Sequence, residues 1–301
     1  MDDAELGKAW LETLEHQRRL SPHTLANYSR ALDLLFKLKE KAALRDLDAA
    51  QVRRFVARLH AAGLSGRTLA LTLSAWRGFY RWLARHRAFP ANPAQGVRAP
   101  KSPRHLPKAL SVEQANQLLE ADESNAPEGT PEGKRDQAMF ELLYSSGLRL
   151  AELVAMDADD GRLDLKQGEV TVTGKGAKTR TVPVGARARD SLRVWLKARA
   201  QLAAPQERAL FVGARGRRIA PGTVQARLRA WSRRKGLGAA VHPHMLRHSF
   251  ASHVLQSSQD LRAVQEMLGH ASISTTQVYT HLDFQALAKV YDAAHPRARK
   301  K

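Results

Sequence analysis

The 301-residue sequence predicts a mainly α-helical protein with one small β-hairpin or sheet, an α+β fold built in two domains. Apolar residues recur at helical spacing through most of the chain, and a single valine-rich segment alternates with the period of a strand. A proline-dense stretch separates two regions that are each rich enough in apolar residues to form a core. The length agrees with this division, because single cores rarely grow to this size.

The N-terminal region, residues 1–89, predicts a helical domain. Ser21 followed by Pro22 is typical of a helix start, with an N-cap residue before a proline at the first helical position. Apolar residues then repeat at helical spacing over residues 25–36 and again over residues 69–83. Both stripes predict helices that bury one face.

The segment 90–108 predicts an extended, basic linker. It holds five of the chain's thirteen prolines, a density that no helix tolerates. Ser111 followed by Gln114 then indicates the first helix of a second domain, residues 109–301.

Within the second domain the sequence predicts a surface loop over residues 122–133 and a helix that ends at Gly147. Valines alternate on either side of residues 174–178, which indicates a hairpin with a glycine-rich turn. The remainder predicts helices, and the last of them carries an apolar stripe at residues 284–291.

The charge points to a polyanionic partner. Lys and Arg outnumber Asp and Glu by 49 to 29, a formal net charge of +20. No apolar run is long enough for a membrane span and no signal peptide opens the chain, so nucleic acid is favoured over a membrane. The absence of cysteine fits a cytoplasmic protein. The basic residues that we expect to touch DNA phosphates are Arg67, Arg77, Arg81 and Lys101. For any one of them, a merely solvated side chain is the simpler interpretation.

Two clusters in the first half of the second domain are candidates for chemistry. Arg149 directly follows a glycine break at the start of a predicted helix, where a guanidinium fork can bind an anion. Lys175 lies at the hairpin tip and could reach a substrate oxygen; the surrounding residues do not match a nucleotide-binding P-loop. Taken alone, each is better explained as a surface residue.

Two further clusters lie near the C-terminus. His244 and Arg247 are three positions apart on a predicted helix and could bind one anion together, whereas a zinc motif fails because Met245 stands where metalloproteases place glutamate. His270 follows a glycine, and Tyr279 sits among polar residues early in another predicted helix. The other tyrosines lie on apolar stripes and predict buried structural roles.

In this order and spacing, the six residues resemble the catalytic signature of the tyrosine recombinases. The resemblance extends over the whole chain and implies a SAM-like core-binding domain, then a catalytic domain with a C-terminal interaction helix. It implies that Tyr279 is the nucleophile and forms a 3′-phosphotyrosyl link to DNA, with no metal and no cofactor. Arg149 and Arg247 would then clamp the scissile phosphate. Lys175 would protonate the leaving oxygen, and His244 and His270 would hydrogen-bond the phosphate.

The chain's last residues are similar to those of the family members that resolve chromosome dimers. This similarity implies action on double-stranded DNA at a dif-like site during chromosome partition and cell division. It also implies a heterotetramer with a XerD-like recombinase, with control by a septal DNA translocase as a further expectation. Other interpretations stay open: relaxation of DNA by a type IB topoisomerase, another integrase or transposon recombinase, or a DNA-binding protein without catalysis.

Overall fold

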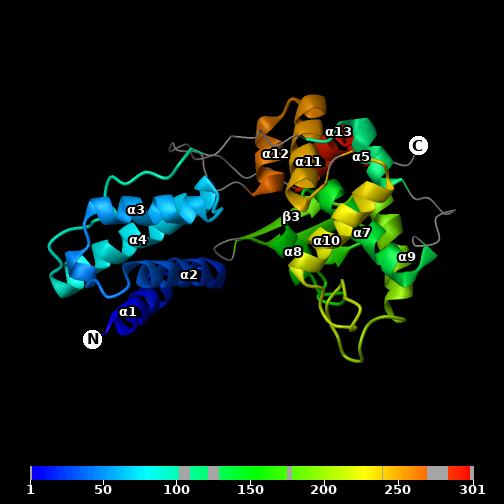
Figure 1. Cartoon of the computed structure of the whole chain (residues 1–301). Helices are drawn as coiled ribbons and strands as arrows, with labels where there is room; N and C mark the ends of the chain where they lie inside the picture. The colour runs from blue at the N-terminus through cyan, green and yellow to red at the C-terminus, as the bar shows by residue number, and fades with distance from the viewer. Residues whose placement is uncertain are drawn as a thin grey trace. The chain divides into compact units, whose positions relative to one another are not determined.

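The computed structural model describes residues 2–101, 109–120, 129–174, 178–238, 240–269 and 284–298, apart from the side chains of residues 284 and 285 (Figure 1). The chain forms two compact units, Met1–His105 and Leu106–Lys301. Both contain mostly helices, which confirms the predicted fold class. Within the described part of the chain, no helix combines the length and apolar character needed to cross a membrane.

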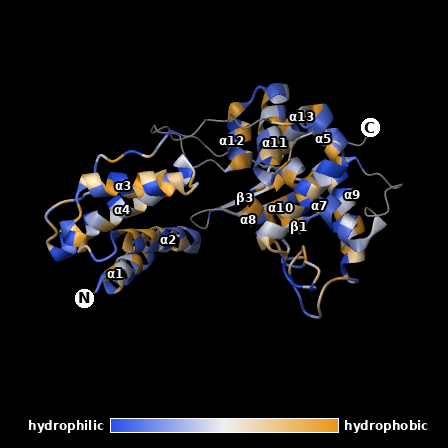
Figure 2. Cartoon of the chain, in the orientation of Figure 1, coloured by the Kyte–Doolittle hydropathy of each residue, from blue (hydrophilic) through white to orange (hydrophobic). Residues whose placement is uncertain are grey.

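The N-terminal unit is helical. Its elements are α1 (Asp3–His16), α2 (Pro22–Lys39), the short 3₁₀ helix η1 (Leu44–Asp46), α3 (Ala49–Ala61) and α4 (Gly66–Arg87). The start of α2 is as predicted, because the Ser21 side chain accepts a hydrogen bond from the backbone of Thr24 and Pro22 follows at the first helical position. The helices carry both hydrophobic and hydrophilic residues along their lengths (Figure 2), so each can bury one face and expose the other.

Aromatic side chains fill the core of this unit. The rings of Trp10 and Tyr28 stack at 5.5 Å between α1 and α2. The buried indole of Trp76 donates to the carbonyl of Ala31, and the buried hydroxyl of Tyr80 donates to the carbonyl of Leu44. Packing therefore holds the helices together, and the few buried polar atoms bond to nearby backbone.

The C-terminal unit, Leu106–Lys301, surrounds one central helix, α7. Its other helices are α5 (Val112–Leu119), α8 (Leu150–Ala155), α9 (Ala186–Arg199), α10 (Pro221–Arg234), α11 (Pro243–Ser258), α12 (Leu261–Leu268) and α13 (Phe284–Ala294). Helix α7 (Pro131–Ser146) packs against α5, α9, α10 and α11, so nearly its whole circumference is buried. Its start corrects the predicted loop, because Thr130 caps a helix that already includes residues 131–133.

The predicted hairpin is present and forms part of a three-stranded antiparallel sheet. Its strands are β1 (Leu163–Asp164), β2 (Glu169–Thr173) and β3 (Thr179–Pro183), in the order β1-β2-β3. In the β2–β3 register Val170 faces Val182, and Val172 faces Arg180. Strand β1 was not predicted, since two residues are too few for an alternating pattern.

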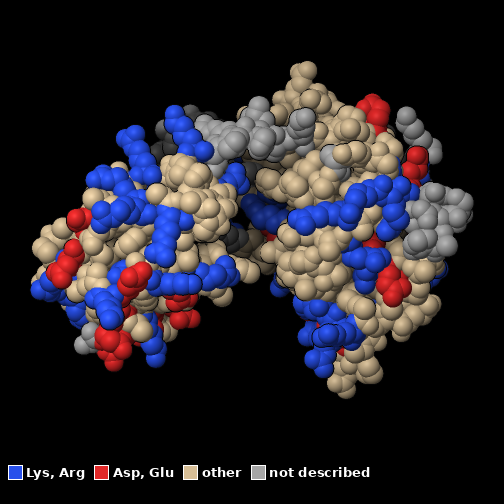
Figure 3. Space-filling view, in the orientation of Figure 1, with Lys and Arg blue, Asp and Glu red and all other residues tan. Residues whose placement is uncertain are grey.

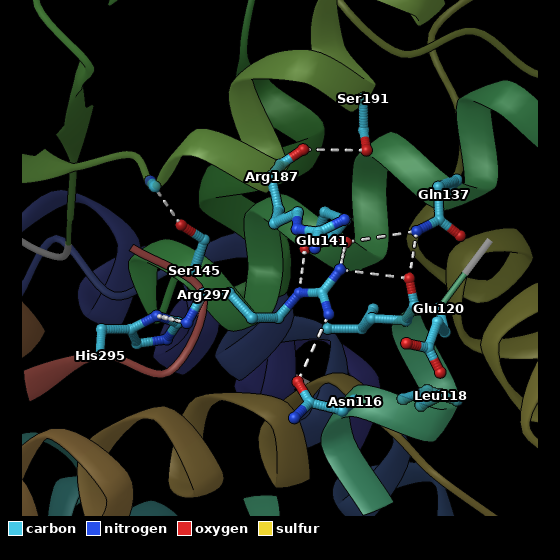
Figure 4. Close-up of polar contacts among 12 residues, drawn as sticks. Asn116, Leu118, Glu120, Gln137, Glu141, Ser145, Arg187, Ser191, His295 and Arg297 are labelled. Atoms are coloured by element: carbon cyan, nitrogen blue, oxygen red, sulfur yellow. Dashed lines mark hydrogen bonds and ion pairs between the residues drawn. The ribbon is translucent and has the colours of Figure 1, made fainter. Parts of the chain in front are cut away.

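The C-terminal helix α13 packs against α11 and β3 of its own chain. Tyr291 on α13 is buried, and its hydroxyl forms a 2.7 Å hydrogen bond with that of Ser145 on α7. Beyond the helix, the guanidinium of Arg297 forms a buried ion pair with the carboxylate of Glu141 and a weaker bond to Asn116, as Figure 4 shows. The last described turn of the chain is thus tied to the central helix α7 of the C-terminal unit.

Candidate active site

Arg149 stands at the junction between α7 and α8. Helix α7 ends at Gly147, whose left-handed conformation (φ 58°) turns the chain, and a Cβ at this position would overlap the ring of Phe250. Arg149 is the N-cap of α8, and its side chain is 40% exposed. Its guanidinium donates to Oε1 of Glu152 at 2.8 Å and to the carbonyl of Gly269 at 3.2 Å.

Arg247 reaches the same region from α11. Its buried guanidinium donates to the carbonyls of Gly147 and Leu268, so it joins the end of α7 to the end of α12. His244, one turn earlier on the same helix, is exposed, and its ring is nearly parallel to that of His242 at 6.4 Å. The two predicted clamp arginines therefore bond to successive carbonyls, those of Leu268 and Gly269, directly before His270.

Two residues that the sequence interpretation did not assign to the site complete this arrangement, Glu152 and Arg180. Arg180 on β3 donates through both terminal nitrogens to the two oxygens of Glu152, at 2.7 and 2.8 Å. Its Nε donates to the carbonyl of Met267 at 2.8 Å. The alternation of the hairpin residues already indicates that Arg180 faces inward, because Arg180 lies on the hairpin face that otherwise carries valines. Glu152 stands three positions after Arg149, which by itself suggests only a surface ion pair, whereas its side chain is 3% exposed.

The electrostatics follow from three guanidinium groups around one carboxylate. Burial alone would raise the pKa of Glu152, but hydrogen bonds from Arg180 and Arg149 outweigh it and hold the pKa below its usual value. Burial, together with the positive charges of Arg149 and Arg180, lowers the pKa of Arg247 to about 10. With three guanidinium groups and one carboxylate, the cluster carries an excess of positive charge suited to a phosphate.

Three of the predicted catalytic residues, Lys175, His270 and Tyr279, lie outside the described residues. The structure does describe the residues that flank the segments in which these three lie. The backbone of Gly174 pairs with that of Lys178 at the base of the hairpin tip, and Gly269 ends α12 in a left-handed conformation. The structure thus places the side chains of Arg149 and Arg247 beside each other, at the backbone of Leu268 and Gly269 immediately before His270.

Among the predicted DNA contacts, Arg67, Arg81 and Lys101 are exposed. Arg77 is different: its guanidinium donates to the carbonyls of Ala94 at 3.2 Å and Val97 at 3.0 Å. These bonds hold residues 94–97 against α4, so the structure shows an internal role for Arg77, and its predicted contact with a phosphate stays untested. Figure 3 shows Lys and Arg side chains spread over the visible face of the N-terminal unit and gathered in a few groups on that of the C-terminal unit, in agreement with the positive net charge.

Comparison with known proteins decides the family. Residues 108–286 match the phage integrase family, and residues 8–87 match the phage integrase N-terminal SAM-like domain. The chain belongs to the phage integrase family, the tyrosine recombinases. This recombinase is 54% identical over 312 residues to tyrosine recombinase XerC 1 of Ralstonia nicotianae, covering 97% of this chain and 94% of that protein. It is also 54% identical over 296 residues to tyrosine recombinase XerC of Pseudomonas aeruginosa PAO1, covering 97% and 95%.

Solved structures show the same fold. A XerH site-specific recombinase bound to a palindromic difH substrate superposes with a TM-score of 0.68 at 21% identity, covering 97% of this chain and 81% of that one. A λ integrase dimer on a core site gives a TM-score of 0.68 at 19% identity, covering 92% and 98%. The predicted assignment to the family and to site-specific recombination is confirmed by the family match and the identities to the curated relatives.

Proposed function

We propose that this recombinase cuts and rejoins double-stranded DNA through a 3′-phosphotyrosyl link to Tyr279. In this proposal Arg149 and Arg247 clamp the scissile phosphate, and His244 and His270 hydrogen-bond its oxygens, His244 also accepting the proton of the tyrosine. Lys175 protonates the departing 5′ oxygen. The covalent link conserves the energy of the phosphodiester, so that the 5′ hydroxyl of another strand can attack it and rejoin the DNA.

One observation carries the proposal. Arg149 and Arg247 come from different helices, yet they donate to the successive carbonyls of Gly269 and Leu268. Both guanidinium groups thus lie at the segment that leads to His270 and, nine positions later, to Tyr279. Because a pair of arginines presents several donors in fixed planes, it suits the non-bridging oxygens of a phosphate.

The magnitudes require such a clamp. A tyrosine in water has a pKa near 10, so only about one molecule in a thousand is phenolate at pH 7. Three pKa units correspond to roughly 4 kcal/mol, which the site must supply together with stabilisation of the charge that develops on the phosphorane. Fixed positive groups supply both, because they favour the phenolate and the additional negative charge of the transition state.

The resolution of chromosome dimers at a dif-like site is the biological role that we propose. It rests on the identity of about one half to tyrosine recombinases named XerC, maintained over nearly the full chain. A heterotetramer with a XerD-like recombinase, control by a septal DNA translocase and a cytoplasmic location belong to the same proposal. The relatives support this role over that of a phage or transposon integrase, and no feature among the described residues of the site favours a topoisomerase.

The C-terminal interaction helix belongs to this proposal. In the single chain α13 packs against its own α11 and β3, as expected of a helix that carries an apolar stripe. Docking of this helix into a neighbouring subunit is a prediction for the assembled complex. Such an exchange would have to break the buried bonds of Tyr291 and Arg297 or reproduce them on the neighbour.

Tyr279→Phe tests the proposed nucleophile. The substitution removes one oxygen, so DNA binding should persist while covalent protein–DNA adducts on a nicked substrate disappear. The measurement is adduct formation on denaturing gels beside a gel shift for binding. The control is Tyr28→Phe, a substitution that should leave cleavage unchanged because the ring of Tyr28 stacks on Trp10 in the N-terminal unit.

Tyr291 is a poor control, since its hydroxyl bonds to Ser145 in the core. Adducts formed by Tyr279→Phe would refute the assignment.

A further inference from the structure

Arg180 connects three parts of the site that are distant in sequence. It belongs to β3, on the hairpin whose tip carries Lys175. Its terminal nitrogens bind Glu152 on α8, and its Nε binds the carbonyl of Met267 at the end of α12. The side chain is only 12% exposed, so it faces these partners and not the solvent.

The carboxylate of Glu152 is fully used. Its Oε1 accepts from the guanidinium groups of Arg149 and Arg180, and its Oε2 accepts from Arg180 and from the backbone nitrogen of Arg149. A carboxylate has about four acceptor positions, and all four are filled here. Arg149 is therefore held by one side-chain bond to Glu152 and not by a two-pronged pair, because Arg180 occupies the remaining positions.

This division leaves Arg149 available to a substrate. If Arg180 were absent, a buried carboxylate with two empty acceptor positions would attract the guanidinium of Arg149 more fully. The fork of Arg149 would then turn from the exposed side of the site toward Glu152. A displacement of about 1 Å in a positioning group can lower a reaction rate about 100-fold.

The turn before His270 is fitted to the same side chain. Gly269 adopts a left-handed conformation with φ 63°, and a Cβ there would lie 3.0 Å from Cδ of Arg180. The carbonyls of Met267, Leu268 and Gly269 bind Arg180, Arg247 and Arg149 respectively. Three successive carbonyls thus each meet a different arginine.

We propose that Arg180 is a positioning residue for phosphate cleavage. It saturates Glu152 so that Arg149 keeps its fork toward the phosphate, and it fixes the α12 turn from which the chain continues to His270. Arg180 itself does not touch the substrate. This inference rests on the proposed function of Arg149 as part of the clamp.

The test compares Arg180→Met and Arg180→Lys with the wild type. The rate of covalent adduct formation in single turnover on nicked DNA should fall about 100-fold in Arg180→Met, while the dissociation constant for a half-site changes less than about threefold. Arg180→Lys should recover only part of the rate, because an ammonium cannot fill both oxygens of Glu152 and the carbonyl of Met267 together.

A second substrate separates positioning from folding. This substrate carries a neutral methylphosphonate in place of the scissile phosphate, and its two diastereomers are tested separately. Because one charged oxygen is replaced by a methyl group, the arginine clamp has less negative charge to stabilise. The loss caused by Arg180→Met should therefore shrink to less than about tenfold on at least one diastereomer. An equal loss on both substrates, or a normal rate on ordinary DNA, would overturn the proposal and leave Arg180 a fold-stabilising residue.

The matched control is Arg193→Met. Arg193 also donates to a carboxylate, that of Asp190, and to a backbone carbonyl, that of Leu165, but it has no bond to Glu152. Its cleavage rate should equal that of the wild type on both substrates. A wild type that formed no adduct at all would instead refute the proposed function, so the two failures are distinguishable.

Discussion

The two units of this recombinase bury very different side chains. Among the described residues of the N-terminal unit, Thr72 is the single polar residue in the buried class, and its hydroxyl bonds within its own helix. The catalytic unit buries charged residues on several elements. They are Arg135, Asp136, Glu141, Glu152, Arg247 and Arg297. The N-terminal unit is thus held by apolar packing, and the catalytic unit by packing together with cross-linked charges.

This difference follows from what each unit must hold. A helical unit that grips a polyanion needs a firm core and an exposed basic surface, and apolar packing provides the first without constraining the second. A catalytic unit must fix guanidinium groups to within a fraction of an ångström. Buried carboxylates and carbonyls fix the guanidinium groups by accepting their hydrogen bonds. Each buried charge needs a partner of opposite charge to offset the cost of its desolvation.

The largest effect should come from breaking the buried ion pair between Glu141 and Arg297. Arg297→Met leaves the carboxylate of Glu141 buried without its main partner, which typically costs about 3–5 kcal/mol. Hydrogen exchange measured by mass spectrometry should show weaker protection in α7 and α13, while α4 of the N-terminal unit keeps its protection.

Two variants sharpen this test. Arg58→Met breaks the exposed pair with Glu40 in the N-terminal unit and should change stability by less than about 0.5 kcal/mol. The double variant Glu141→Leu, Arg297→Met removes both charges and should regain much of the stability. A double variant as unstable as Arg297→Met alone would mean that packing and not charge pairing holds this segment.

A smaller effect concerns pH. Burial among aromatic rings lowers the pKa of His295 to about 3, against about 6.5 in an unfolded chain. Between pH 6.5 and pH 3 the imidazole of His295 is therefore protonated in the unfolded chain but not in the folded protein. The contribution of the neutral imidazole to stability is complete above pH 6.5 and is lost as the pH falls toward 3. The loss is at most about 1.4 kcal/mol per pH unit.

Comparison with His295→Leu isolates this effect. Burial also lowers the pKa of His253, which adds to the loss of stability at low pH. Burial raises the pKa of Glu141, which opposes that loss. The positive charge of Arg297 also lowers the pKa of His295. Between pH 7 and pH 5 the wild type should lose about 2 kcal/mol more than His295→Leu in urea denaturation. Parallel pH profiles would show that the imidazole accepts its proton in the folded state.

The smallest effect on stability should come from the exposed basic residues of the N-terminal unit. Replacing Arg67, Arg81 and Lys101 by alanine should leave the fold intact and reduce the slope of log K against log salt by about 0.9 for each phosphate that the variant no longer binds. Arg77→Ala is the matched control, since its bonds to Ala94 and Val97 are internal: it should lower stability and leave the slope unchanged. A reduced slope for Arg77→Ala would show that Arg77 binds DNA as well.

Much of the fold could be predicted from the sequence, because local signals are strong where they exist. Ser21 and Pro22 start a helix by their own chemistry, and alternating valines indicated the hairpin. The start of α7 was missed because Thr130 and Pro131, the same kind of signal, stand beside a stretch rich in Pro, Gly and Glu. The residue types of the site were recognisable as a set. The hairpin pattern places Arg180 on the face that carries the valines, but it does not identify the partners of Arg180. Arg180 contacts Glu152 and Met267 only after the chain has folded, and no local spacing encodes those contacts.

The cluster of Arg149, Arg180, Arg247 and Glu152 holds three positive charges and one negative charge, so the resting site is out of electrical balance by two units. A phosphodiester carries one negative charge, and its pentavalent transition state carries two. In the proposed mechanism a bound phosphodiester therefore offsets one of the two excess charges of these four side chains, and the second is offset only as the bond to phosphorus forms. In that mechanism the repulsion among the three arginines would be relieved in stages along the reaction coordinate, and the last stage would coincide with the chemical step.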